Sequence, residues 1–197
     1  MSPPAAAEQQ ARDLRAITAD GVFFSTMVGL GETYVPAFAL AVGLGEVVAG
    51  LIATLPMLVG ALFQLVTPWA VRKLRSYRRW IVACACLQAV SFLPLIVGAA
   101  LGQIALGWLA IATVAYWSFG MATSPAWNAW VTSLVPAEIR AHFFAGRTRV
   151  AQAALFGAIL LGGITLHWGR IGDAQLVFFA LLFAAAMVSR FVSASFL

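Results

Sequence analysis

Two acidic residues fall within an apolar stretch near the start of the chain, and their carboxyl groups could bind protons or a solute there. Glu32 and Asp20 both lie inside residues 15–42. An ionised carboxylate at the centre of a lipid bilayer costs about 2.5–3.5 kcal/mol on insertion scales, so protein, water or a bound proton must compensate for it. We expect Glu32 to bind a proton or a solute; the alternatives are a hydrogen bond from its protonated form to a neighbouring helix and a position nearer the outer interface.

Asp20 stands twelve residues before Glu32. On a helix this separation is about 18 Å along the axis and about 120° around it, so the two carboxyl groups cannot exchange a proton directly. We therefore expect Asp20 to lie near the membrane interface, at a helix end or beside a basic residue. A role in solute or proton binding is the alternative.

Three further polar side chains interrupt apolar stretches and are larger than close helix packing requires: Gln64, Tyr116 and Asn128. They belong to stripes of small and polar residues at helical spacing. Such stripes either bring helices together or line a water-filled cavity. We treat all three as candidates for contact with a solute, with Asn128 near the cytoplasmic surface.

The sequence offers no case for catalysis or for a bound metal. His142 and His167 have no second histidine, cysteine or carboxylate at ligand spacing. Nucleophile elbows, phosphate-binding loops and dinucleotide fingerprints are missing as well. We expect a protein that is not an enzyme and that needs no cofactor.

The composition predicts a membrane protein. Hydrophobic residues make up 62% of the chain and charged residues 10%, whereas about a quarter of a soluble domain is charged. A transmembrane helix needs about 20 apolar residues. Six stretches meet this need, and a soluble helical bundle would show more polar faces. The predicted spans are 15–42, 46–70, 80–101, 104–130, 148–168 and 174–196.

The basic residues predict the orientation of these spans. With the amino terminus in the cytoplasm, eleven of the twelve lysines and arginines lie on the inner side, and Arg170 alone lies outside. Positive charge is retained on the cytoplasmic side of membranes. We expect a multi-pass protein of a bacterial inner membrane, with a cytoplasmic segment at 1–13 and a transmembrane domain at 14–197. Because the charges are spread over several loops, nucleic acid is not an expected partner.

Two connections carry a family resemblance. The connection at 71–79 is basic, and the one at 131–149 contains a Pro-x-Glu-x-Arg segment at 136–140 followed by Phe143, Phe144, Gly146 and Arg147. With six spans, this arrangement resembles the amino-terminal half of the major facilitator superfamily over essentially the whole chain. One departure is Val71, which stands where the family has an aspartate.

The resemblance implies an all-α transmembrane fold, a six-helix bundle of two inverted three-helix repeats at about 14–101 and 104–197. In such a fold the first and fourth spans line a central cavity. The resemblance also implies a cytoplasmic gate, for which the matching positions are Arg72, Arg75, Arg79, Glu138, Arg140 and Arg147.

The function expected from this resemblance is secondary active transport. A small solute would move by alternating access, coupled to protons through Glu32. The alternative is a membrane assembly or scaffold protein that has the fold but moves no solute. The family has twelve spans, so we expect a second six-helix half, which a longer chain, a second copy or another protein would supply; a degenerate remnant is the remaining explanation.

The orientation can be tested with inserted epitope tags. A tag in the 71–79 connection should be reached by antibody only in inside-out vesicles, because the basic connections face the cytoplasm. A tag in the 169–172 turn should be reached only from outside intact cells. Labelling of the 71–79 tag on intact cells, or a chain that stays dissolved without detergent, would contradict the assignment.

Overall fold

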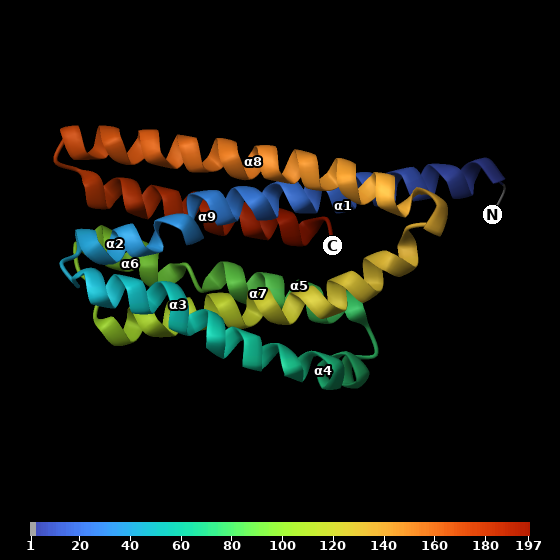
Figure 1. Cartoon of the computed structure of the whole chain (residues 1–197), viewed down its shortest axis with the longest axis horizontal. Coiled ribbons are helices and arrows are strands. Elements are labelled where there is room, and N and C mark those ends of the chain that lie inside the picture. The colour runs from blue at the N-terminus through green and yellow to red at the C-terminus, as the bar shows by residue number, and fades with distance from the viewer. Residues whose placement is uncertain (1–2) are drawn as a thin grey trace.

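The structure is a computed structural model that describes residues 3–197, with side chains described from Glu8 onward. The helices lie side by side along one long axis (Figure 1). Their bounds are α1 Pro3–Leu30, η1 Glu32–Tyr34, α2 Val35–Ala41, α3 Glu46–Phe63, η2 Gln64–Val66, α4 Thr67–Leu74, α5 Tyr77–Val90, α6 Leu93–Leu101, α7 Leu106–Leu134, α8 Ala137–Ile171 and α9 Gln175–Ser195.

Among residues 3–197, five helical segments are long and apolar enough to cross a membrane, which supports the prediction of a helical membrane protein. They are Glu46–Leu74, Tyr77–Leu101, Leu106–Leu134, Ala137–Ile171 and Gln175–Ser195. The predicted span at 15–42 is not one of these segments, and the helix there is interrupted. α1 ends at Leu30, and α2 begins only at Val35 after a turn of 3₁₀ helix.

The two basic connections are shorter than the sequence indicated. We expected loops at 71–79 and 131–149, but α4 extends to Leu74 and α5 begins at Tyr77. Only Val135 and Pro136 separate α7 from α8. Charged residues keep these segments polar, yet they have helical propensity and simply continue the helices beyond the apolar part. Length and hydropathy therefore located the spans but not the helix ends.

Prolines explain three interruptions. A proline has no amide hydrogen, and its ring clashes with the carbonyl group four residues earlier. Pro36, Pro68 and Pro94 stand four residues after Glu32, Gln64 and Val90. The first two of these are the opening residues of η1 and η2, and Val90 is the last residue of α5.

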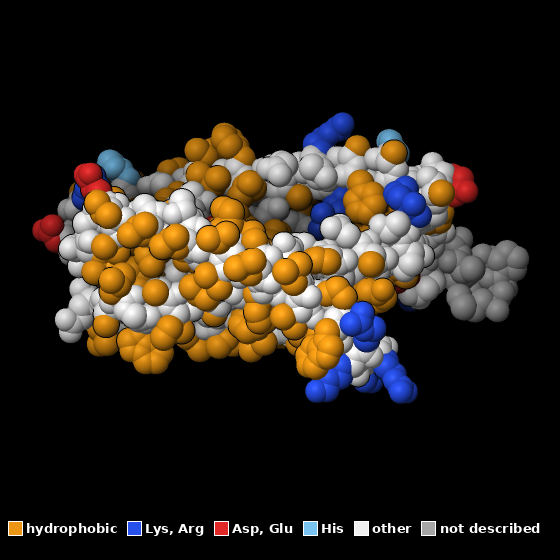
Figure 2. Space-filling view, turned by 60° about the horizontal axis from the view of Figure 1, so that its bottom comes forward, with side chains coloured by type: hydrophobic (Ala, Val, Ile, Leu, Met, Phe, Trp, Pro, Cys, Tyr) orange, Lys and Arg blue, Asp and Glu red, His pale blue; other side chains and the backbone are white. Residues whose placement is uncertain are grey.

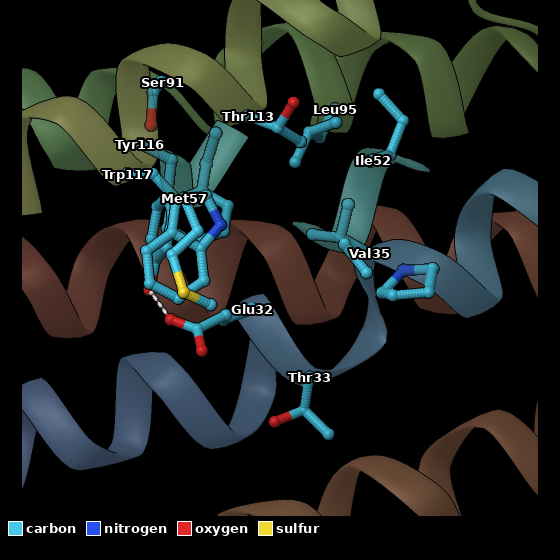
Figure 3. Close-up of a pocket in the computed structure, with 13 residues that line it drawn as sticks. Glu32, Thr33, Val35, Ile52, Met57, Ser91, Leu95, Thr113, Tyr116 and Trp117 are labelled. Carbon is cyan, nitrogen blue, oxygen red and sulfur yellow. Dashed lines mark hydrogen bonds between the residues drawn. The ribbon is translucent and has the colours of Figure 1, made fainter. Parts of the chain in front are cut away.

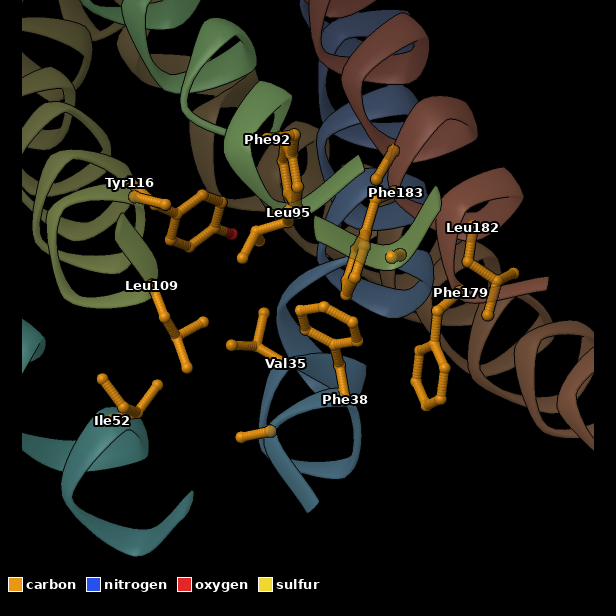
Figure 4. Packing of buried hydrophobic residues seen from close by; sticks show 14 of the residues in the cluster. Val35, Phe38, Ile52, Phe92, Leu95, Leu109, Tyr116, Phe179, Leu182 and Phe183 are labelled. Carbon is orange, nitrogen blue, oxygen red and sulfur yellow. The ribbon is translucent and has the colours of Figure 1, made fainter. Parts of the chain in front are cut away.

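The helices pack as two groups that share α9. α1 lies against α8 and α9, α7 lies against α3 and α5, and α9 also contacts α5 and α6. At the end of the bundle that holds α2 and α6, buried phenylalanines fill the space between helices (Figure 4). The Phe38 and Phe183 rings meet edge to face with centroids 5.3 Å apart, a favourable geometry for aromatic pairs.

The outer surface is apolar along most of the bundle. Figure 2 shows hydrophobic side chains over the middle and several Lys and Arg side chains together at one end. The exposed apolar residues include Val47, Leu58 and Leu62 on α3 and Phe156, Leu161 and Trp168 on α8. Such a surface suits contact with lipid.

Two glycines let neighbouring helices approach closely. A Cβ atom on Gly60 of α3 would lie 2.7 Å from the Trp117 carbonyl oxygen of α7, and one on Gly29 of α1 would lie 2.9 Å from the Leu155 carbonyl oxygen of α8. Both obstacles are backbone atoms, which cannot rotate away. Small residues at helix contacts are the usual route to close packing in membranes.

Gly60→Ala should therefore lower the free energy of unfolding by about 1–3 kcal/mol, as overpacking does. Gly50→Ala is the matched control on the same helix, since a Cβ atom there meets nothing within 4 Å. Unfolding of both variants in mixed detergent micelles measures the difference. Equal stability of the two would show that α3 and α7 do not pack at Gly60.

Candidate functional site

Glu32 and Tyr116 meet in the space between the first and fourth predicted spans. The Tyr116 hydroxyl donates a hydrogen bond to Glu32 Oε2 at 2.7 Å, as Figure 3 shows. Tyr116 is only 7% exposed, and its oxygen also lies 3.3 Å from the Met27 sulfur. Within the described residues, Glu32 Oε1 has no hydrogen bond and no cation lies within 4 Å of the carboxylate.

A cavity of about 280 Å³ surrounds this pair. Its wall is mostly apolar, and its other polar members spend their hydroxyls on their own helices. Ser91 donates to the Gln88 carbonyl oxygen at 2.6 Å, and Thr113 donates to the Leu109 carbonyl oxygen at 2.9 Å. The carboxyl group of Glu32 and the hydroxyl of Tyr116 are thus the groups most able to engage a ligand or a proton there.

The break in the first helix is what presents Glu32 to this cavity. Pro36 prevents a regular helix through residues 31–35, and the Glu32 carbonyl oxygen accepts its hydrogen bond from the Val35 N–H instead. Two side-chain hydroxyls also hold this segment. The Thr33 hydroxyl donates to the Val28 carbonyl oxygen at 3.1 Å, and the Tyr34 hydroxyl donates to the Ile159 carbonyl oxygen of α8. This second bond fixes the interrupted segment against α8.

Asp20 belongs to a second, deeply buried cluster. Its Oδ1 accepts a hydrogen bond from the Ser193 hydroxyl at 2.7 Å. Arg190 Nη1 donates to the same Ser193 oxygen at 2.8 Å, and Arg190 Nε donates to Gln88 Oε1 at 2.7 Å. Asp20 and Arg190 are 4% and 2% exposed. The cluster connects α1, α5 and α9.

Arg147 adds α8 to this cluster. Its Nη2 lies 3.5 Å from Asp20 Oδ2, the only ion pair within 4 Å among the described side chains. Its Nε donates to the Ile17 carbonyl oxygen at 3.1 Å, and its guanidinium group lies 4.5 Å from the centre of a Trp127 ring. The prediction of a basic partner for Asp20 agrees with this contact.

The remaining candidates for solute contact lie apart from the Glu32 pair. Gln64 opens η2 on the second span and is half-buried. Asn128 is exposed and borders a second cavity of about 190 Å³ beside Asp20, Arg147 and Arg190. Of the five predicted residues, the structure joins Glu32 with Tyr116 and places Asp20 and Asn128 at the other cavity.

The proposed gate residues have varied surroundings. Arg140 Nη2 donates to the Thr132 and Val135 carbonyl oxygens at 3.0 and 3.1 Å, which caps the end of α7. Glu138 is exposed, and the described residues show no ion pair within 4 Å that involves it. Arg72, Arg75 and Arg79 are exposed at the α4–α5 junction.

Three cluster residues were missed from the sequence: Arg190, Gln88 and Ser193. Arg190 was counted only as a positive charge of the cytoplasmic side, because it lies near the end of the last span. A usable signal did exist, since Arg190 and Gln88 interrupt long apolar stretches and such residues face the bundle interior. Their mutual contact joins positions 102 residues apart and could not be read from spacing.

Comparisons with protein families, with curated proteins and with solved structures each found no match to this chain. The geometry of the two cavities is therefore the basis on which a function is proposed.

Tyr116→Phe should cost about 1 kcal/mol of stability, the usual scale for a hydrogen bond between membrane helices, because Glu32 loses its donor. Tyr77→Phe removes the same atom from an exposed ring and serves as the control. Unfolding curves of the two purified variants give the difference. A Tyr116→Phe protein as stable as Tyr77→Phe would mean that the Glu32 bond contributes nothing.

Proposed function

We propose that this chain is the amino-terminal six-helix half of a secondary active transporter of the major facilitator kind, which moves a small solute together with protons. The main support is the position of Glu32, a carboxyl group on a broken helix that faces a cavity inside an apolar bundle. Interrupted helices at a mid-membrane site are a recurring way for transporters to expose polar groups to a solute.

Glu32 suits the role of proton carrier. It has no cationic partner among the described residues, so binding a proton changes the charge of the cavity from negative to neutral. Tyr116 donates to one oxygen and leaves the other free to take up the proton. A charged Glu32 carboxylate destabilises a conformation that shields it from water more than a neutral Glu32 does, because electrostatic energies are large in a low-dielectric space. Protonation of Glu32 is thereby coupled to a conformational change.

The packing of the helices supports two related halves within the chain. The first three spans are α1–α2, α3–α4 and α5–α6, and the next three are α7, α8 and α9. Suppose that the first span is exchanged with the fourth, the second with the fifth and the third with the sixth. The α1–α8 contact then becomes the α7–α3 contact, and the α1–α9 contact becomes the α7–α5 contact. The α6–α9 contact maps onto itself. Three spans are an odd number, so the halves would run in opposite directions.

The two cavities support a path for the solute. α1 and the adjoining η1 contribute Glu32 to one cavity and Asp20 to the other, and α7 contributes Tyr116 to the first and Thr123 to the second. Both cavities therefore border the same pair of helices, at different heights. A second six-helix half facing α1 and α7 would enclose this path and allow alternating access.

Glu32→Gln tests the proposal, because the amide keeps the shape and cannot carry a proton. Proteoliposomes of the chain with its second half, filled with a pH-sensitive dye, should show proton flux when a transported solute is added. The variant should lose nearly all of this flux, because an amide side chain cannot take up or release a proton. Glu46→Gln, at the exposed start of α3, is the matched control.

Two outcomes would contradict the proposal. Unchanged solute-driven proton flux in Glu32→Gln would remove Glu32 from the coupling. The absence of flux with every solute of a broad panel, in a preparation that is correctly assembled, would favour a membrane scaffold instead.

A further inference from the structure

The buried cluster around Asp20 carries an unbalanced charge. It contains two guanidinium groups, from Arg147 and Arg190, and one carboxylate. Arginine stays protonated in proteins, so the cavity wall holds a net positive charge. Leu197 also borders the cavity, but its main-chain oxygen accepts a hydrogen bond from Arg78, a different cation. Buried charge without a counter-ion is costly in an apolar bundle.

The arginines also have donors to spare. Arg190 has five N–H groups, of which Gln88 and Ser193 engage two. Its Nη2 has no hydrogen bond among the described residues, although Arg190 is only 2% exposed. The Trp127 indole nitrogen borders the same cavity; it faces the Asp20 carboxylate but makes no hydrogen bond within 3.5 Å among the described residues. Arg190 Nη2 and the Trp127 indole N–H are therefore hydrogen-bond donors that an acceptor group of a bound ligand could engage.

The rest of the wall adds both polar and apolar surface. Thr123, Ser124 and Asn128 lie on α7, and the rings of Phe24 and Trp127 form apolar sides. Ser124 and Asn128 are exposed, so the cavity is open where these two residues line it. Gly120 leaves room for the Gln88 side chain, because a Cβ atom there would lie 2.4 Å from Gln88 Nε2.

We propose that this cavity binds the solute and that the solute is a small organic monoanion, held by its carboxylate between Arg147 and Arg190. The inference rests on the proposed function and adds the class of substrate. One negative charge balances the cluster, whereas a doubly charged phosphate would leave an excess. Arginine binds carboxylates through paired hydrogen bonds, and the aromatic walls suit an apolar body of a size that fits about 190 Å³.

The proposal gives the two cavities separate tasks. The anion occupies the cavity at Asp20 on α1, and the proton occupies Glu32 in η1 just beyond the end of α1, roughly 18 Å away at 1.5 Å per residue. A monoanion and a proton together carry no net charge, so their joint movement across the membrane is electroneutral. The membrane potential would then not drive it, and the proton gradient alone would.

Binding of benzoate and benzamide tests the inference without any need for transport. The two probes have the same shape and differ in charge. Calorimetry on the full chain in phosphatidylcholine nanodiscs should show benzoate binding and no benzamide binding. Arg190→Gln and Arg147→Gln should each weaken benzoate binding by about tenfold or more, since each removes a charge-assisted hydrogen bond. Asp20→Asn should strengthen it, because the carboxylate competes for both arginines.

Arg149→Gln is the matched control, an exposed arginine two positions from Arg147 on α8; its affinity should equal that of the unmodified protein. Arg190 is deeply buried, so monodispersity in gel filtration is checked first, and Arg147→Gln decides the matter if Arg190→Gln does not fold. Equal binding of the two probes, or unchanged benzoate affinity in a folded arginine variant, would overturn the proposal. So would loss of benzoate binding in nanodiscs containing phosphatidylglycerol, which would assign the site to a lipid headgroup.

The outcome is independent of the test of Glu32. Arginine-dependent benzoate binding together with a failed proton-flux experiment would keep the anion site and reject coupled transport. Proton flux driven only by neutral solutes would keep coupled transport and reject the anion site.

Discussion

The buried carboxylate of Asp20 is the constraint on which the arrangement of the bundle depends. No water is present in a lipid core to solvate it, so protein groups must do so. Ser193 of α9 and Arg147 of α8 meet this need, and Ser193 and Gln88 of α5 in turn accept hydrogen bonds from Nη1 and Nε of Arg190. Any shift of α1 against these helices would leave a buried charge without a partner, which is more costly than the loss of an apolar contact.

This constraint reaches the Glu32 cavity through the helix itself. Fixing Asp20 fixes the rotation and height of α1, and the glycine contact of Gly29 with α8 holds the same helix a few turns further on. The interrupted segment after Leu30 is then positioned against α8 by Tyr34 and against α7 by the bond between Tyr116 and Glu32. The two cavities are thus set by one helix that is anchored at both levels.

Much of the fold could be predicted from the sequence, because long apolar stretches must be helices in a membrane. The contact of Glu32 with Tyr116 could be predicted only as a shared cavity, since spacing does not tell which side chains meet across helices. The ends of α4 and α8 were predicted poorly, because charged residues outside the lipid are also good helix formers. The role of Arg190 was not predicted, because an arginine near the end of a span is also explained as one of the positive charges that orient the protein in the membrane. Only the packing of the helices shows that its side chain points into the bundle.

The proline interruptions have a mechanical consequence for the bundle. At Glu32, Gln64 and Val90 the regular hydrogen-bond ladder is already broken, so bending there breaks no further backbone bond. α2 and α6 lie beyond two of these points at one end of the bundle, and α4 lies beyond the third at the opposite end (Figure 1). Bending is therefore possible near both ends of the bundle, while α8 and α9 run through without interruption or internal proline and form the rigid frame against which the short segments can tilt.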